Sequence, residues 1–130
     1  MTVHQHVAAP SWTMQSLRAV VVLHVVALLF QAVTAGMLLS SSGGRALHVM
    51  SGVALVVIGL LHLVMAILVW RPGGGPAQFI PSAALLLVFT VVAAILGDLG
   101  AKTFHLPLGV LLFGGGVVQL SRVLARPGRA

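Results

Sequence analysis

The charged residues divide the chain into four long stretches that carry no charge. These stretches occupy residues 19–44, 46–70, 72–97 and 103–121. About 20 apolar residues in a helix, rising about 1.5 Å each, cross the roughly 30 Å hydrocarbon layer of a bilayer, so each stretch is long enough to span it. Only 6% of the residues are charged and 59% are hydrophobic, which leaves too little charge to cover a soluble domain. The sequence therefore predicts an all-α integral membrane protein.

We expect an antiparallel four-helix bundle, because clusters of Gly, Pro and Ser separate the apolar stretches and mark turns. The predicted helices occupy about 17–39, 46–69, 79–97 and 104–124, with a polar tail at 1–16 and a basic tail at 125–130. A β structure is disfavoured, because the apolar runs lack period-2 alternation and only a closed barrel of about eight or more strands can span as β. An N-terminal signal peptide is a weaker alternative for the first helix.

The basic residues are divided unevenly between the two ends of the predicted helices. Five lie on one side and two on the other: Arg18, Arg71, Arg122, Arg126 and Arg129 against Arg45 and Lys102, which accompany Asp98. The positive-inside rule therefore predicts that both termini are cytoplasmic. The net charge of +6 does not indicate nucleic acid as a partner, because the basic residues are not clustered with stacking aromatic residues.

A short pattern is repeated at the start of the second and fourth predicted helices. It consists of a basic residue, two spacers, a histidine, three spacers and a glycine, and it occurs as Arg45, His48 and Gly52 and again as Lys102, His105 and Gly109. His62 and Gln119 each follow the histidine of their own helix by fourteen residues (62 − 48 and 119 − 105). The repeat suggests two related helical hairpins.

The repeated residues fall on one face of each helix, because 3.6 residues complete a turn. The face is small in its middle and polar at its ends in both helices: His48, Gly52, Leu55, Gly59 and His62, then His105, Gly109, Leu112, Gly116 and Gln119. Small residues allow close packing of membrane helices, so one interpretation is two packing seams. The other is that the glycines make space for a flat cofactor held by histidines.

Four histidines are expected at two depths in the bundle. His48 and His105 begin even-numbered helices and share an outer level, whereas His24 and His62 share an inner level about 21 Å away, since fourteen residues separate the levels. Two imidazoles that bind one haem iron need helix backbones about 12 Å or more apart, which suits diagonal helices rather than neighbours at about 8–10 Å. His48 and His105 are therefore the better pair of axial ligands, with interfacial hydrogen bonding as the alternative role.

The inner level is a weaker candidate for a second haem. His24 and His62 come from neighbouring helices, and the diagonal counterpart of His62 is Gln119, a poor ligand for iron. Arg45 and Lys102 stand about one turn outside the outer ligands, where they are placed to meet haem propionates or, alternatively, to serve as interface anchors. His4 and His6 are expected to be solvated.

Gln31 and Gly36, then His48 and later His105, follow an order that resembles one four-helix half of haem A synthase. The order also resembles that of small four-helix membrane proteins of actinobacteria, so we expect a bacterial plasma membrane. The resemblance covers about two thirds of the chain through short motifs. It implies haem between the second and fourth helices, on His48 and His105. It does not imply the synthase activity, because that enzyme has two such halves and acidic residues near its working site.

The residue types exclude several classes of enzyme. One acidic residue cannot provide paired-carboxylate chemistry, and the absence of cysteine excludes thiol nucleophiles and covalent haem attachment. The leading hypothesis is a b-type haem protein with one haem, or two, that transfers electrons and works with a redox partner or quinone. The alternatives are a haem-free helical subunit or small-molecule carrier, and a haem-modifying enzyme in which one ligand is labile. A homo-oligomer is compatible with each of these hypotheses.

Overall fold

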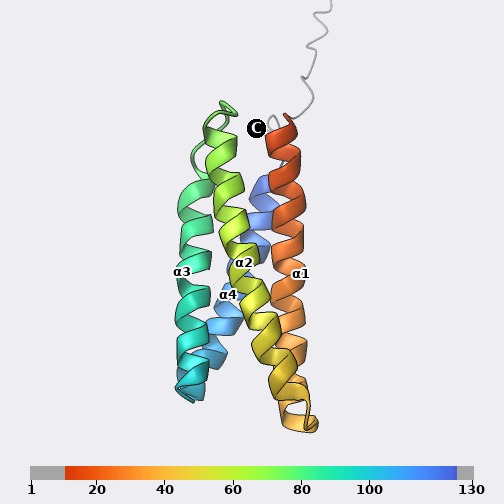
Figure 1. Ribbon diagram of the computed structural model, residues 1–130. Coiled ribbons are helices and arrows are strands. Elements are labelled where there is room, and N and C mark those ends of the chain that lie inside the picture. The colour runs from red at the N-terminus through yellow and green to blue at the C-terminus, as the bar shows by residue number, and fades with distance from the viewer. Residues whose placement is uncertain (1–10, 126–130) are drawn as a thin grey trace, which may run out of the picture.

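The protein consists of four antiparallel helices in the computed structural model, which describes residues 11–125 (Figure 1). The helices are α1 (Trp12–Ser40), α2 (Gly44–Trp70), α3 (Phe79–Asp98) and α4 (Lys102–Leu124). All four are long and apolar enough to cross a membrane. The predicted fold class is therefore confirmed.

The first helix begins at Trp12 rather than at residue 17, so the polar tail is shorter than predicted. The side chain of Ser11 accepts a hydrogen bond from the backbone N–H of Met14, which is the usual role of an N-cap serine. The prediction began the helix next to Arg18, but α1 starts earlier, and Nε of Arg18 donates to the carbonyl of Val123 at 3.1 Å. A long basic side chain can thus remain within a helix and tie α1 to the end of α4.

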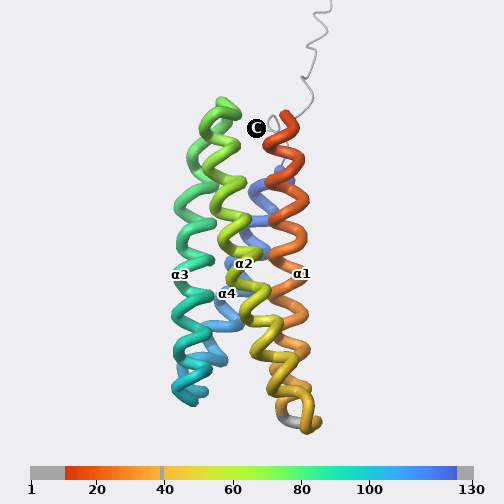
Figure 2. Tube along the Cα trace, in the orientation of Figure 1, coloured from red at the N-terminus to blue at the C-terminus, as the bar shows by residue number. Residues whose placement is uncertain are grey.

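The helices form a closed ring in which each packs against its two neighbours in the order α1, α2, α3, α4 (Figure 2). Within the described residues, the backbones of α2 and α4 make no close contact, and neither do those of α1 and α3. Helices α2 and α4 are therefore diagonal, as predicted. Helices α1 and α2 pack more extensively than the other pairs, and the two hairpins diverge at the end of the bundle that is lower in Figure 1.

The interior contains two apolar clusters. The upper core, nearer the described chain ends, comprises Leu17, Val21, Met65, Ala66, Val69, Phe79, Ala83 and Val123, and the lower core comprises Leu28, Leu55, Leu86, Ala93 and Leu112. Along their helices, the buried polar residues His24, His62 and Gln119 lie between members of the two cores. The bundle thus has a polar layer inside an apolar interior.

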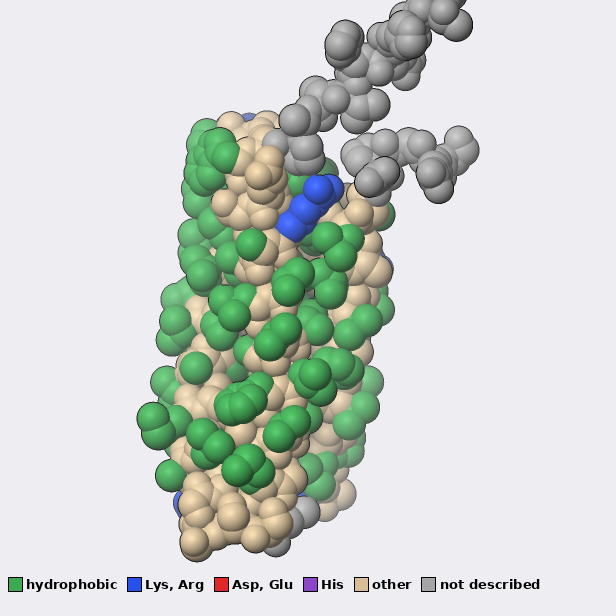
Figure 3. All heavy atoms as spheres, turned by 90° about the vertical axis from the view of Figure 1, so that its right-hand side faces the viewer, with side chains coloured by type: hydrophobic (Ala, Val, Ile, Leu, Met, Phe, Trp, Pro, Cys, Tyr) green, Lys and Arg blue, Asp and Glu red, His purple; other side chains and the backbone are tan. Residues whose placement is uncertain are grey.

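The outer surface matches a lipid environment. Large apolar side chains on all four helices are exposed, and Figure 3 shows hydrophobic atoms spread over the face in view, with basic side chains near its ends. Such a surface is costly in water and favourable in a bilayer. The two short turns depend on glycine at Gly44, where a Cβ would overlap the backbone of Met37, and at Gly100, where φ is +72°.

Candidate functional site

A cavity of about 490 Å³ lies in the lower half of the bundle. All four helices contribute to its walls, which are mostly apolar: Leu28, Leu29, Gln31, Ala32, Ala35, His48, Gly52, Leu55, Thr90, Ala93, Ala94, His105, Leu106, Gly109, Val110, Leu112 and Phe113. The volume falls within the range of about 300–1,000 Å³ that is typical of ligand pockets. The cavity therefore has the size and the lining of a site for an apolar small molecule or cofactor.

Two histidines from diagonal helices meet at this cavity. The ring centroids of His48 on α2 and His105 on α4 are 6.1 Å apart, and the ring planes are turned by 80° to each other. The structure thus brings together the two residues that the sequence repeat singled out. Both line the same cavity, as do the two glycines of the repeat, Gly52 and Gly109.

The ring of His105 is held by the backbone of α3. Its Nδ1 lies 2.7 Å from the carbonyl oxygen of Ala93, and because a carbonyl can only accept, Nδ1 must carry the hydrogen. In the neutral ring this leaves Nε2 with a free lone pair. Gly97 provides the space, since a Cβ at this position would stand 3.0–3.1 Å from Cε1 and Nδ1 of His105. Histidines that bind metals are commonly oriented by such an outer hydrogen bond.

The ring of His48 is held by polar side chains of α1. Its Nδ1 lies 3.0 Å from the hydroxyl oxygen of Thr34, which donates its own hydrogen to the carbonyl of Gln31 at 2.9 Å and so can accept from Nδ1. The amide nitrogen of Gln31 donates to the carbonyl of His48 at 3.2 Å and lies 3.3 and 3.4 Å from the two ring nitrogens. Ser51 donates to Gln31 Oε1 and completes the network.

The two glycines of the repeat differ in their surroundings. A Cβ at Gly109 would meet no atom within 4 Å and would project into open space beside the cavity. A Cβ at Gly52 would instead stand 3.2 Å from the amide nitrogen of Gln31. Gly52 therefore makes room for the glutamine that contacts His48, whereas Gly109 leaves the cavity itself open.

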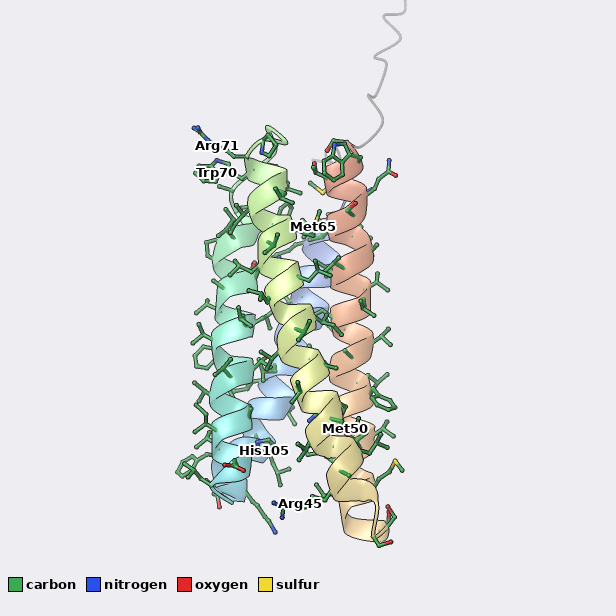
Figure 4. All side chains as sticks on the ribbon, in the orientation of Figure 1. Arg45, Met50, Met65, Trp70, Arg71 and His105 are labelled. Carbon is green, nitrogen blue, oxygen red and sulfur yellow. The ribbon has the colours of Figure 1, made fainter. Side chains whose placement is uncertain are left out.

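The basic residues of the repeat lie at the lower end of the bundle. Arg45 and Lys102 are exposed in the first turns of α2 and α4, three residues before His48 and His105 respectively. Figure 4 shows Arg45 below His105, at the end where the hairpins diverge. Cations at this depth face the water interface, where they can pair with an anionic group without being desolvated.

The inner histidines form a different arrangement. His24 and His62 are fully buried, and their Nδ1 atoms are 2.9 Å apart, so one ring donates directly to the other. Both Nε2 atoms are buried without a hydrogen-bond partner. A haem iron between the two Nδ1 atoms would need them about 4 Å apart, because its two axial ligands lie on opposite sides and each iron–nitrogen bond takes about 2 Å.

The second haem site proposed for this level thus gains no support from the structure. Gln119 does not contact the histidine pair through hydrogen bonds. Its Oε1 accepts from the hydroxyl of Ser82 at 2.7 Å and its amide faces the carbonyl of Phe79, so it joins α4 to α3.

The histidine pair should be strongly coupled in stability. His24→Leu is expected to destabilise the bundle by about 1–3 kcal/mol, because it leaves Nδ1 of His62 buried without a partner. The double variant His24→Leu/His62→Leu removes both polar groups and should cost about 1 kcal/mol or more less than the sum of the single variants. Unfolding in a denaturing detergent measures all four proteins of the cycle, and strictly additive effects would contradict the coupling.

Comparison with known proteins identifies no relative of this chain. No family model, no curated protein and no solved structure matches it. Among the described residues, no group of three or more His, Cys, Asp or Glu is placed to hold a metal ion. The functional argument therefore rests on the cavity and on the two histidines that face it.

Proposed function

We propose that the chain binds one haem b between α2 and α4, with Nε2 of His48 and Nε2 of His105 as axial ligands. The observation that supports this most is that the two rings, held on opposite sides by α3 and α1, stand on the wall of one cavity. Ala93 engages Nδ1 of His105, so Nε2 of this ring has no protein partner among the described residues. Thr34 engages Nδ1 of His48, so Nε2 of this ring has only the amide nitrogen of Gln31, at 3.4 Å. Neutral imidazole with a free Nε2 is the form that binds haem iron.

The spacing of the two rings fits the group. Two iron–nitrogen bonds of about 2 Å, plus about 1 Å from each nitrogen to its ring centroid, place the centroids of two axial imidazoles about 6 Å apart. The observed separation is 6.1 Å. The histidine pair on neighbouring helices, His24 and His62, does not offer this spacing, because the two rings are in direct contact.

Haem bound in this way supplies one-electron redox chemistry, which makes electron transfer the activity that the site supports best. The apolar walls exclude water from the ring, while Arg45 and Lys102 are available to pair with the propionates at the membrane surface. A quinone or a redox protein is the partner that this chemistry requires.

The visible spectrum of the purified protein in detergent tests the proposal. We expect the sharp α and β bands of low-spin, six-coordinate haem in the reduced protein, with about one haem per chain by pyridine haemochrome. A colourless protein, which takes up no added haem, would overturn the proposal. The apolar cavity would then favour a small-molecule carrier.

We also propose that both termini are cytoplasmic, so that the His48 and His105 level lies near the opposite surface. The support is the charge asymmetry of the sequence, with five basic residues on the side of the termini and two on the other. Reporter fusions at Ala130 should be active in the cytoplasm. Activity of an exported reporter at this position would reverse the orientation.

A further inference from the structure

The two proposed ligands are held in different ways. The difference determines whether a protein group can take up Nε2 after it dissociates from the iron. His105 has a single polar partner among the described residues, the carbonyl of Ala93. No described side chain forms a hydrogen bond with its Nε2, so none competes with iron for that lone pair. The hydrogen bond at Nδ1 holds the ring against α3, so this ring is expected to stay in place.

His48 has a replacement partner already in position. The amide nitrogen of Gln31 lies 3.4 Å from Nε2 and 3.3 Å from Nδ1 of this ring. An amide nitrogen carries two hydrogens and can donate to the carbonyl of His48 and to a ring nitrogen at the same time. After dissociation from iron, Nε2 of His48 would thus accept a hydrogen bond from the amide of Gln31.

From this asymmetry we infer that His48 is the exchangeable ligand, that Gln31 receives its Nε2, and that the vacated position admits a small neutral diatomic ligand. The inference rests on the proposed function. The exchange breaks one iron–nitrogen bond and forms one bond to the incoming ligand, with no change in the number of electrons or protons. A neutral diatomic molecule suits the site, because the walls are apolar and carry no described charged residue.

Carbon monoxide is the probe, added to the reduced protein with its haem in place. We expect binding whose rate saturates as the concentration of carbon monoxide rises, because dissociation of His48 limits it. His48→Ala should bind in proportion to concentration and without saturation. Gln31→Leu should lower the saturating rate or the affinity by roughly five- to tenfold, the effect of about one hydrogen bond.

Thr90→Val is the matched control. Thr90 also lines the cavity, but its hydroxyl donates to the carbonyl of Leu86 in its own helix and contacts neither histidine. This variant should bind carbon monoxide like the unmodified protein. A second readout is haem retention in detergent, which should survive better in His48→Ala than in His105→Ala.

The outcomes separate this inference from the function on which it rests. A protein without haem refutes the proposed function before any gas is added. A protein with six-coordinate haem that does not bind carbon monoxide when reduced overturns the inference alone. An unchanged saturating rate together with an unchanged affinity in Gln31→Leu would also overturn the role of Gln31.

Discussion

His105→Ala is expected to abolish the low-spin spectrum of the reduced protein. The variant removes the proposed ligand, whose ring is held by the carbonyl of Ala93 and packs against Gly97. No other side chain among the described residues can replace it, because α3 contributes no histidine and Gln119 lies in the polar layer above the cavity. Spectra and haem content of the purified variant measure the loss.

His48→Ala should also abolish the six-coordinate spectrum but should leave five-coordinate, high-spin haem on His105. His24→Ala is the control, since this histidine contacts His62 and does not line the cavity. Its haem content should stay close to that of the unmodified protein. Loss of all haem in His24→Ala, with no effect of His105→Ala, would show that the ligands have been assigned to the wrong level.

The sequence predicts the helices and the diagonal pair because both depend on properties of whole segments, the length of each uncharged stretch and the shortness of each turn. Charge-free length sets the number of spans, and an up-down bundle with short turns places α2 opposite α4. The error at the start of α1 has a local cause. Arg18 was treated as the membrane boundary, but its side chain reaches the carbonyl of Val123 from within the helix.

The orientation of the two proposed ligands could not be predicted from the sequence. His105 is held by the carbonyl of Ala93, and any residue supplies a carbonyl, so no side-chain pattern reports this contact. Gly97 makes the contact possible but resembles any other glycine near a helix end. The role of Ser51 was also missed, because its contact with Gln31 depends on how α1 and α2 are rotated about their axes.

The level of His24 and His62 was predicted correctly, but their contact was not. Sequence spacing places both near the middle of neighbouring helices, which is compatible with a cofactor between them or with a direct hydrogen bond. Only the packing of α1 against α2 decides between these arrangements, and it brings the Nδ1 atoms to 2.9 Å. The glycines likewise share one sequence pattern but have different roles in the structure.

Gly109→Leu is expected to lower haem affinity by about 5- to 150-fold while the apoprotein stays folded. The leucine enters open space beside the cavity, because no atom lies within 4 Å of the Cβ position. It therefore displaces cofactor volume rather than protein atoms, and overpacking of a filled site costs about 1–3 kcal/mol. Leucine also favours a helix in lipid, so the apoprotein loses nothing.

Gly114→Leu is the matched control on the same helix. Gly114 also has no atom within 4 Å of its Cβ position, but it is exposed and does not line the cavity. Gly52→Leu is less informative, because the new side chain would push the amide of Gln31 and disturb His48. Haem titration and thermal unfolding of the same samples separate the two roles of Gly109. If Gly109→Leu instead melts at a lower temperature and keeps its haem per folded chain, the glycine serves helix packing and the cavity is not the site of the ring.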